Sequence, residues 1–251
     1  MYPVLIIIPT LNEVENINNI IEAVLEVNSD YHILVVDDSS TDGTIEVVKK
    51  LQEIKKNLYL QVRTNSRGLG KAYIFGFKWA IQKEYEYILE MDADFSHNPK
   101  DIPRLIHACE KEGYDLAIGS RYINNKINVI NWDFKRLILS YLASKYVKLI
   151  TGIPVFDTTA GFICYRRKVL ETIDYSEIRF TGYAFQIEMK FKAWLRLFKI
   201  KEVAIVFTDR TKGESKLDSS IISEAIFGVI KMKIKGLKKT INHGMHSNKG
   251  S

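Results

Sequence analysis

The chain contains few cysteines and no long apolar run. Its two cysteines, Cys109 and Cys164, have a spacing that fits neither a disulfide framework nor a zinc site. No stretch approaches the roughly 20 uncharged apolar residues that cross a bilayer. Pro9 ends the first apolar run near the N-terminus, so we expect no signal peptide. These absences favour a protein of the reducing cytosol that is soluble or lies on a membrane surface.

Two common nucleotide-binding loops are missing as well. The first apolar run is not followed by Gly-x-Gly-x-x-Gly, which argues against a dinucleotide-binding dehydrogenase. Residues 66–71 contain two glycines and a lysine, but they lack the spacing of a P-loop. The five histidines are scattered, and His97, near an acidic turn, is expected to be a surface residue. A histidine-based metal site is therefore not predicted.

The composition is that of a folded, mildly basic protein. Hydrophobic residues make up 46% of the chain, which is enough for a sizeable core. Lys and Arg together number 36 against 30 Asp and Glu, giving a net charge of +6. Such an excess suits phosphates, nucleotides or acidic lipid as partners.

Short apolar runs alternate with segments of helical periodicity, which predicts a mostly parallel α/β sheet covered by helices on both faces. The predicted strands are 4–8, 32–36, 58–62, 87–91 and 116–119, and the predicted helices are 12–28, 44–54, 70–84 and 101–112. Further along, a helix is expected at 134–150, strands at 162–165 and 203–207, and a lysine-bearing helix at 219–241. We expect a catalytic domain over 1–218 that includes helix 134–150, then the helix 219–241 and a polar tail over 242–251.

Charged residues directly follow several predicted strands. In open sheets of this kind, ligands bind beyond the carboxyl ends of the strands. Asp92 and Asp94 can both reach one divalent cation whose other ligands are water and phosphate oxygens. The alternative is that they are two solvated turn acids. Asp37 and Asp38 are suited to accept from a nucleotide base or ribose, or to cap the next helix.

Cationic residues complete this edge of the predicted sheet. Arg121 follows the fifth strand, and its planar guanidinium suits a diphosphate. Arg210 and Lys216 lie in a charged, glycine-containing loop suited to closing over anions. For each of these cations, the alternative is an ordinary surface charge.

Together these segments resemble the family-2 inverting glycosyltransferases of the GT-A fold. That resemblance is carried by residues 4–13, 35–44 and 91–94. A narrower resemblance, to the dolichol-phosphate mannose synthases, is carried by residues 67–70, 94–99, 119–122, 132–136, 182–189 and 210–216. It extends from about Val4 to about Gly236, nearly the whole chain.

The resemblance implies transfer of mannose from GDP-mannose to a polyprenyl or dolichyl phosphate, with inversion and with Mg²⁺ or Mn²⁺ as cofactor. It implies that the nucleotide pocket contains Pro9, Leu11, Glu13, Val35 and Asp37. It places Asp92, Ala93, Asp94 and Ser96 beside the diphosphate and metal, with Asp92 and Asp94 as ligands. It implies that Arg121, Arg210 and Lys216 hold donor and acceptor phosphates, and that Arg136 and Ser140 help to seat the acceptor phosphate. By the same resemblance, Asp94, Arg121 and Arg210 are the expected catalytic residues.

Two positions depart from the family pattern. Leu11 stands where the family often has tyrosine, which alters packing on the base. Ser96 stands where some members have glutamine, so a third metal ligand is expected to be water.

The implied acceptor decides whether a general base is needed. A lipid phosphate is already ionised at neutral pH, so its attack needs no strong base, whereas a hydroxyl acceptor would need a carboxylate. Asp157 is the candidate base in that second case, or else a structural turn residue. The alternatives to mannosyl transfer are transfer of glucose or another sugar from a UDP-sugar to a lipid phosphate or glycan hydroxyl, and nucleotide-sugar binding without catalysis. Nucleic-acid binding is not expected, because the lysines lack interleaved aromatics.

Two segments combine apolar and basic residues. In helix 134–150, apolar positions alternate with basic ones; they are Leu137, Tyr141, Tyr146 and Leu149 beside Lys135, Arg136, Lys145 and Lys148. Helix 219–241 carries a similar mixture. Both are suited to lie on anionic lipid, or else to pack on the core with solvated lysines. We expect attachment to the cytoplasmic face of a membrane, directly or through a membrane-protein partner.

Overall fold

The structure, a computed structural model, describes residues 3–64, 67–123, 126–180, 182, 184–209 and 228–234. The predicted site residues Arg210 and Lys216 lie outside the described residues, as do the tail 242–251 and most of the predicted helix 219–241. Residues 228–234 of that helix are described, and they are helical.

A seven-stranded sheet forms the centre of the molecule, with strand order β10-β5-β9-β4-β1-β2-β3. The strands are β1 (Val4–Thr10), β2 (His32–Asp37), β3 (Leu58–Val62), β4 (Tyr87–Glu90), β5 (Leu116–Ser120), β9 (Ile163–Arg166) and β10 (Ile200–Ala204). Only β9 runs antiparallel to its neighbours β4 and β5; the other described pairings within this sheet are parallel. The mostly parallel sheet predicted from the sequence is confirmed.

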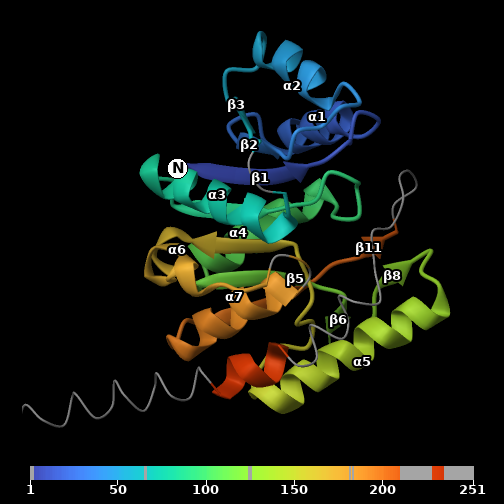
Figure 1. Cartoon of the computed structure of the whole chain (residues 1–251), viewed down its shortest axis with the longest axis vertical. Helices are drawn as coiled ribbons and strands as arrows, with labels where there is room; N and C mark the ends of the chain where they lie inside the picture. Colours follow the sequence, from blue (N-terminus) through green and yellow to red (C-terminus); the bar gives the residue numbers. More distant parts are fainter. Residues whose placement is uncertain are drawn as a thin grey trace, which may run out of the picture.

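Helices cover both faces of this sheet (Figure 1). One face packs against α1 (Ile17–Val27), α2 (Thr44–Gln52) and α4 (Ile102–Glu110). The other packs against α3 (Leu69–Gln82), α6 (Arg167–Thr172) and α7 (Ala184–Leu195). Two short 3₁₀ turns, η1 (Pro99–Asp101) and η2 (Tyr175–Glu177), complete the connections. Helix α1 begins five residues later than the predicted 12–28, because residues 12–16 form the loop that follows β1.

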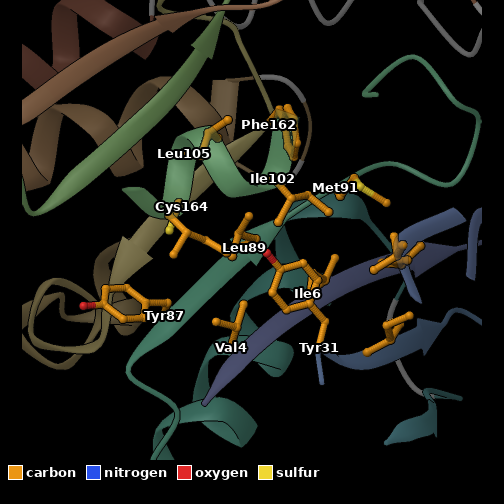
Figure 2. Packing of buried hydrophobic residues seen from close by; sticks show 14 of the residues in the cluster. Val4, Ile6, Tyr31, Tyr87, Leu89, Met91, Ile102, Leu105, Phe162 and Cys164 are labelled. Atoms are coloured by element: carbon orange, nitrogen blue, oxygen red, sulfur yellow. The ribbon is translucent and has the colours of Figure 1, made fainter. Parts of the chain in front are cut away.

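Alternate residues of each strand enter different hydrophobic clusters. On β1, Ile6 and Ile8 join the cluster beneath α1 and α4, whereas Leu5 and Ile7 join the cluster beneath α3 and α7. Figure 2 shows the first cluster, in which Ile6 packs beside Leu89 and Tyr31. Because the strands are buried on both sides, they read as continuous apolar runs in the sequence. At Gly76 of α3, a Cβ atom would lie 2.8 Å from Ile7, so a side chain there would push α3 off the sheet.

The chain between β5 and β9 adds further elements beside the central sheet. Short strands β6 (Tyr122–Ile123), β7 (Lys126–Ile127) and β8 (Val129–Ile130) lead to α5 (Phe134–Thr151). Strand β8 pairs with β11 (Phe207–Thr208), so the predicted strand 203–207 is divided between β10 and β11. Figure 1 shows α5 extending to one side of the sheet, close to the helical residues 228–234. There, Lys233 Nζ donates to the Thr151 carbonyl at 2.7 Å. Within the described residues, no helix has the length and apolar character needed to span a bilayer.

Candidate active site

Three loops at one edge of the sheet contain residues with positive φ. Asn12 (φ 59°), Ser39 (φ 61°) and Phe95 (φ 61°) follow β1, β2 and β4, which are adjacent strands. Residues other than glycine rarely adopt this conformation, and it concentrates where a functional site needs a particular loop shape. The edge at the carboxyl ends of these strands is therefore the candidate site.

Asp37 joins the first two of these loops. Its buried carboxylate accepts from Thr10 Oγ1 at 2.7 Å, from the Ser40 backbone N–H at 2.7 Å and from Ser40 Oγ at 2.6 Å. The Asn12 backbone N–H in turn donates to Ser40 Oγ at 2.8 Å. These contacts hold the loops after β1 and β2 in a fixed relation. In this structure, Asp37 therefore anchors the predicted nucleotide pocket.

The other residues predicted for the nucleotide pocket fall into two groups. Pro9, Leu11 and Glu13 are partly exposed along the loop after β1. Val35 is fully buried in the core beneath α1, so its side chain supports β2 rather than lining an open surface.

Asp38 connects the loop after β2 with the segment before α3. Its carboxylate pairs with Arg63 Nη1 at 3.0 Å and accepts from the Gly68 backbone N–H at 2.8 Å. Sequence reasoning missed Arg63, although its place directly after β3 gave the same signal that singled out Arg121. The pair ties the ends of β2 and β3 to the start of α3.

The acidic loop after β4 is held by contacts on both sides. Tyr73 Oη donates to Asp92 Oδ1 at 3.3 Å, and the Ser96 backbone N–H donates to Asp94 Oδ1 at 3.0 Å. Ala93 and Ser96 are buried, whereas Asp92 and Asp94 are partly exposed. The structure therefore places the two predicted metal ligands together at the accessible edge.

The donor set of this loop fits a hard divalent cation. The described residues contain no group of three or more His, Cys, Asp or Glu side chains that would hold a metal by themselves. Mg²⁺ and similar ions do not need such a cage, because they keep several waters and are bound by one or two carboxylates plus substrate phosphates. Asp92 and Asp94 are a pair of this kind.

His97 supports the same loop from beneath, and the expectation of a surface histidine is wrong. The ring is buried and stacks on Phe162, with centroids 4.9 Å apart. Burial lowers the pKa of His97, which favours the neutral imidazole. Its Nδ1 accepts from the Asp92 backbone N–H at 3.1 Å, so the ring orients the acidic loop.

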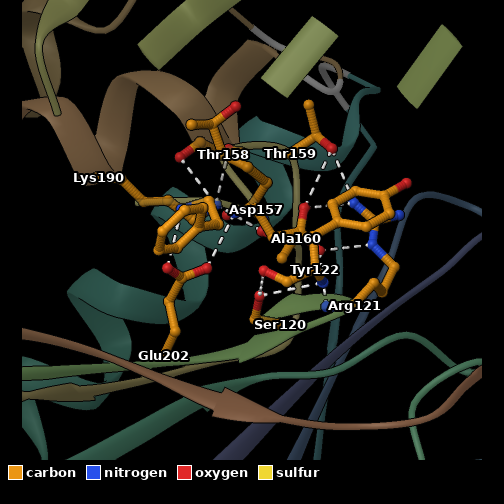
Figure 3. Close-up of polar contacts among 11 residues, drawn as sticks. Ser120, Arg121, Tyr122, Asp157, Thr158, Thr159, Ala160, Lys190 and Glu202 are labelled. Atoms are coloured by element: carbon orange, nitrogen blue, oxygen red, sulfur yellow. Dashed lines mark hydrogen bonds and ion pairs between the residues drawn. The ribbon is translucent and has the colours of Figure 1, made fainter. Parts of the chain in front are cut away.

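Arg121 forms a two-pronged ion pair with Asp157 (Figure 3). Arg121 Nε and Nη2 donate to the two carboxylate oxygens at 2.7 and 2.6 Å, and the Arg121 backbone N–H adds a third bond at 2.9 Å. Asp157 is 0% exposed. Burial alone would raise the pKa of Asp157, but the Arg121 charge and its hydrogen bonds outweigh burial and lower it. A carboxylate held in this way is a poor proton acceptor, so the geometry favours the structural role over the base.

Lys190 of α7 supports the segment that contains Asp157. Its ammonium is fully buried and donates to the carbonyls of Ala160 at 2.6 Å and Thr158 at 3.1 Å (Figure 3). Burial lowers the pKa of Lys190 to about 8, against the opposing charges of Asp157 and Glu90. Sequence reasoning missed this lysine, because nothing in a helical segment distinguishes a buried lysine from a solvated one.

A second arginine, Arg136, also lies against Trp132. The Arg121 Cζ atom is 5.2 Å from the ring centroid of Trp132, and the Arg136 Cζ atom is 4.7 Å from it. Arg136 pairs with Asp209, its Nη1 lying 2.9 and 2.8 Å from the two carboxylate oxygens. Ser140 is partly exposed one turn further along α5. The structure thus gathers the described cations of the predicted site around one tryptophan.

Aromatic contacts connect the acidic loop with these arginines. The His97 ring is 5.7 Å from the Phe207 ring, and Arg121 Cζ is 5.4 Å from that same phenylalanine. His97, which supports the acidic loop, and Arg121 therefore both pack against Phe207.

Comparison with known proteins identifies the family. Residues 5–174 match the family described as glycosyl transferase family 2. The chain belongs to this family. As a family-2 glycosyltransferase it is an enzyme of the class expected from its motifs.

Similar proteins include two with related names. The chain is 43% identical to a polyprenol monophosphomannose synthase of Mycolicibacterium smegmatis, over 92% of this chain and 87% of that protein. It is 38% identical to an undecaprenyl-phosphate mannosyltransferase of Micrococcus luteus, over 90% of this chain and 92% of that protein. The resemblance drawn from the sequence motifs is confirmed.

Solved structures show the same fold. Glucosyl-3-phosphoglycerate synthase from Mycobacterium tuberculosis, in complex with Mn²⁺, UDP and glucosyl-3-phosphoglycerate, matches with a TM-score of 0.67 and 16% identity, over 94% of this chain and 80% of that one. A crystal structure of the same synthase with Mg²⁺ and UDP matches with a TM-score of 0.66. The predicted GT-A fold is confirmed, and the roles of single site residues stay predictions.

Proposed function

We propose that this family-2 glycosyltransferase transfers mannose from GDP-mannose to a polyprenyl or dolichyl phosphate, with inversion, and forms a β-linked lipid-phosphate mannose. The observation that carries the proposal is the pairing of an acidic edge, Asp92 and Asp94, with two arginines around Trp132. Such a site accommodates two anionic substrates at once. Both relatives described above are named for mannosyl transfer to isoprenoid lipids, which supports the same substrate class.

The donor end is assigned to the loops after β1, β2 and β4. Asp37 and the residues after β1 border the nucleotide, and Asp92 and Asp94 would hold Mg²⁺ or Mn²⁺ beside the diphosphate. The bound cation would neutralise the negative charge that develops on the departing diphosphate. His97 and Tyr73 hold the acidic loop in place for this task, so little reorganisation is needed when the donor binds.

The acceptor end is assigned to Arg121, Arg136 and Ser140, together with Arg210 and Lys216. An ionised phosphate oxygen attacks the anomeric carbon of mannose from the face opposite the diphosphate. The new bond forms as the carbon–diphosphate bond breaks, and a single displacement of this kind inverts the anomeric configuration. No general base is required, which agrees with an Asp157 carboxylate already committed to Arg121.

The outer face of α5 supports a lipid substrate. Large apolar side chains stand in solvent along it, with Leu149 82% exposed; the others are Phe134, Ile138, Leu139 and Leu142. Lys135 and Lys145 are exposed among them. Of the apolar residues predicted for this face, Leu149 is exposed, whereas Leu137, Tyr141 and Tyr146 are half-buried toward the rest of the molecule. An apolar stripe flanked by cations suits an anionic membrane surface.

Arg136 lies in the first turn of this same helix. A lipid whose phosphate is bound at Arg136 therefore lies next to the surface that would contact the membrane. The proposal accordingly places the enzyme on the cytoplasmic face of a membrane, where nucleotide sugars are available.

The test is a transfer assay on the purified full chain. The protein is incubated with Mg²⁺ or Mn²⁺, a short polyprenyl phosphate, and radiolabelled GDP-mannose or UDP-glucose in parallel. Label that enters the organic phase from GDP-mannose, in a product whose anomeric carbon is β by NMR, supports the proposal. Label from UDP-glucose alone would contradict the assigned donor, and tight nucleotide binding without any transfer would contradict catalysis.

A further inference from the structure

Arg121 and Arg136 each form an ion pair with an aspartate, Asp157 and Asp209 respectively. The two ion pairs differ in how deeply they are buried. In the Arg121–Asp157 pair the side chains are 9% and 0% exposed, and three donors of Arg121 engage the carboxylate. In the Arg136–Asp209 pair the side chains are 25% and 24% exposed, and one nitrogen, Nη1, contacts both oxygens. The first pair is therefore fixed in the interior, whereas water reaches the second.

Under the proposed function, Arg136 receives the phosphate of the lipid acceptor. The Asp209 carboxylate is then already in the position of an anion at that site. A phosphate that takes the Nη1 position of Arg136 replaces this carboxylate. A partly exposed, screened pair yields more readily than a buried one. The Asp209 backbone N–H donates to the Ile130 carbonyl at 3.0 Å, so the residue stays anchored to β8 when its side chain turns away.

We propose that Asp209 is a specificity-determining residue that occupies Arg136 as an internal anion, so that only an acceptor bearing its own negative charge takes its place. A neutral isoprenol offers Arg136 no charge to compensate for the lost carboxylate. An isoprenyl phosphate does, and its several oxygens can each engage a guanidinium nitrogen, whereas in this structure the Asp209 carboxylate contacts Arg136 through Nη1. The pair thereby favours phosphates over alcohols at a cost in acceptor affinity. This inference rests on the proposed function.

This role predicts that removing the Asp209 charge strengthens binding of a lipid phosphate. If Asp209 were an ordinary structural contact, the same change would weaken binding. Asp209→Asn removes the competing charge while keeping the size of the side chain. We expect the Kd of citronellyl phosphate, measured by isothermal titration calorimetry, to fall about threefold to fivefold. The KM for the lipid phosphate should fall by a similar factor. If Asp209 only orients Arg136, the variant will bind the phosphate more weakly instead.

Asp133→Asn is the matched control. Asp133 caps α5 by accepting from the Lys135 backbone N–H, three positions before Arg136, and asparagine caps helices equally well. This variant removes the same charge from the same helix end without touching the ion pair, so its Kd should equal that of the wild type. Asp209→Ser serves as a second variant should the asparagine side chain disturb folding, as judged by the unfolding temperature.

Each outcome decides the inference. Tighter binding by Asp209→Asn alone supports it. Unchanged or weaker binding by Asp209→Asn and Asp209→Ser overturns it, and equal tightening by Asp133→Asn shows that net charge alone is responsible and overturns it too. A wild-type protein that binds GDP-mannose but no citronellyl phosphate would instead contradict the proposed function, and the inference would fall with it.

Discussion

The proposed donor and acceptor ends of the candidate site are built in different ways. At the donor end the acids are held partly by near neighbours in the chain, Asp37 by Ser40 and Asp94 by Ser96. They are also held from further away, Asp37 by Thr10 at 27 positions and Asp92 by Tyr73 at 19 positions. At the acceptor end the cations are held across long stretches of sequence, Arg121 by Asp157 at 36 positions and Arg136 by Asp209 at 73 positions. The donor end therefore combines hydrogen bonds within its loops with contacts between elements, whereas both ion pairs of the acceptor end join residues far apart in the sequence.

This difference implies that damage at the two ends has different consequences. A change in a short loop at the donor end should affect catalysis while leaving the fold intact. A change in a long-range pair at the acceptor end should affect folding in proportion to how deeply the pair is buried. The predictions below test each part of this contrast.

The largest effect is expected at the donor end, from Asp94→Asn. Losing one carboxylate of the pair weakens the cation site, and we expect kcat to fall about a thousandfold, equivalent to about 4 kcal/mol. The transfer assay with GDP-mannose measures this loss, and thermal unfolding should show an unchanged fold. Asp101→Asn, which removes an acid paired with Arg104 on the surface, is the control and should retain full activity. Wild-type turnover by Asp94→Asn would refute the assigned role.

Next in size is the stability loss from Asp157→Asn. The variant leaves the buried Arg121 charge uncompensated, and we expect the free energy of unfolding to fall by about 3 kcal/mol. Asp209→Asn, in the partly exposed pair, should cost no more than about 1 kcal/mol. Urea denaturation at pH 7 measures both, and equal losses would contradict the contrast between the two pairs.

The same variant has a defined pH dependence. The folded pKa of Asp157 lies below the ordinary value of 3.8, so its contribution to stability is present above about pH 4 and is lost as the pH falls through the folded pKa. The difference between wild type and Asp157→Asn should therefore narrow in acid.

A third prediction concerns Glu90, which lies on β4 between the acidic loop and Lys190. Its carboxyl is fully buried, and burial raises its pKa to about 8 from an ordinary 4.5, against the lowering effects of Gln186 and Lys190. The folded protein then binds a proton that the unfolded chain has released between these two values, so stability falls as the pH rises through this window. We expect wild type to lose about 3 kcal/mol between pH 5 and pH 8 relative to Glu90→Gln. Urea denaturation in EDTA checks this, and parallel pH profiles for the two proteins would contradict it.

The smallest effect is expected on the outer face of α5. Leu142 is 57% exposed, so Leu142→Ser should leave stability unchanged but weaken binding to phosphatidylglycerol vesicles by about 1 kcal/mol, or roughly fivefold. Vesicle sedimentation measures the partition. Ile54→Ser, at an apolar residue near α2 that is 75% exposed, is the control and should bind as the wild type does. Equal weakening by both changes would count against α5 as the contact surface.

The sequence predicted the sheet and its acidic edge well, for a physical reason. Strands buried on both faces appear as continuous apolar runs, and the acids that follow β2 and β4 come at once after those runs. The same reasoning gave Arg121 after β5. Each of these features depends only on residues adjacent in the chain.

Features that depend on packing were beyond the sequence. Helix α7 has buried residues on every side, including Gln186, Glu188 and Lys190, so it shows no amphipathic period. The partners Asp157 and Asp209 are ordinary loop acids until the fold brings the arginines to them. Periodicity gave α5 correctly, yet the exposed side differs from the predicted one, because the face that a helix turns to solvent is set by its attachments.

Strand β9 acts as a spacer between two parts of the enzyme. It is inserted between β4 and β5, and with neighbouring strands about 4.8 Å apart the ends of those two strands are separated by about 10 Å. Since β9 is antiparallel to β4 and β5, the residues that precede β9 lie at the same edge of the sheet as the residues that follow β4 and β5. Asp157 and Phe162 arrive by this route to meet Arg121 and His97. This one antiparallel strand thus sets the distance between the ends of β4 and β5. It also determines which residues pack beneath the candidate site.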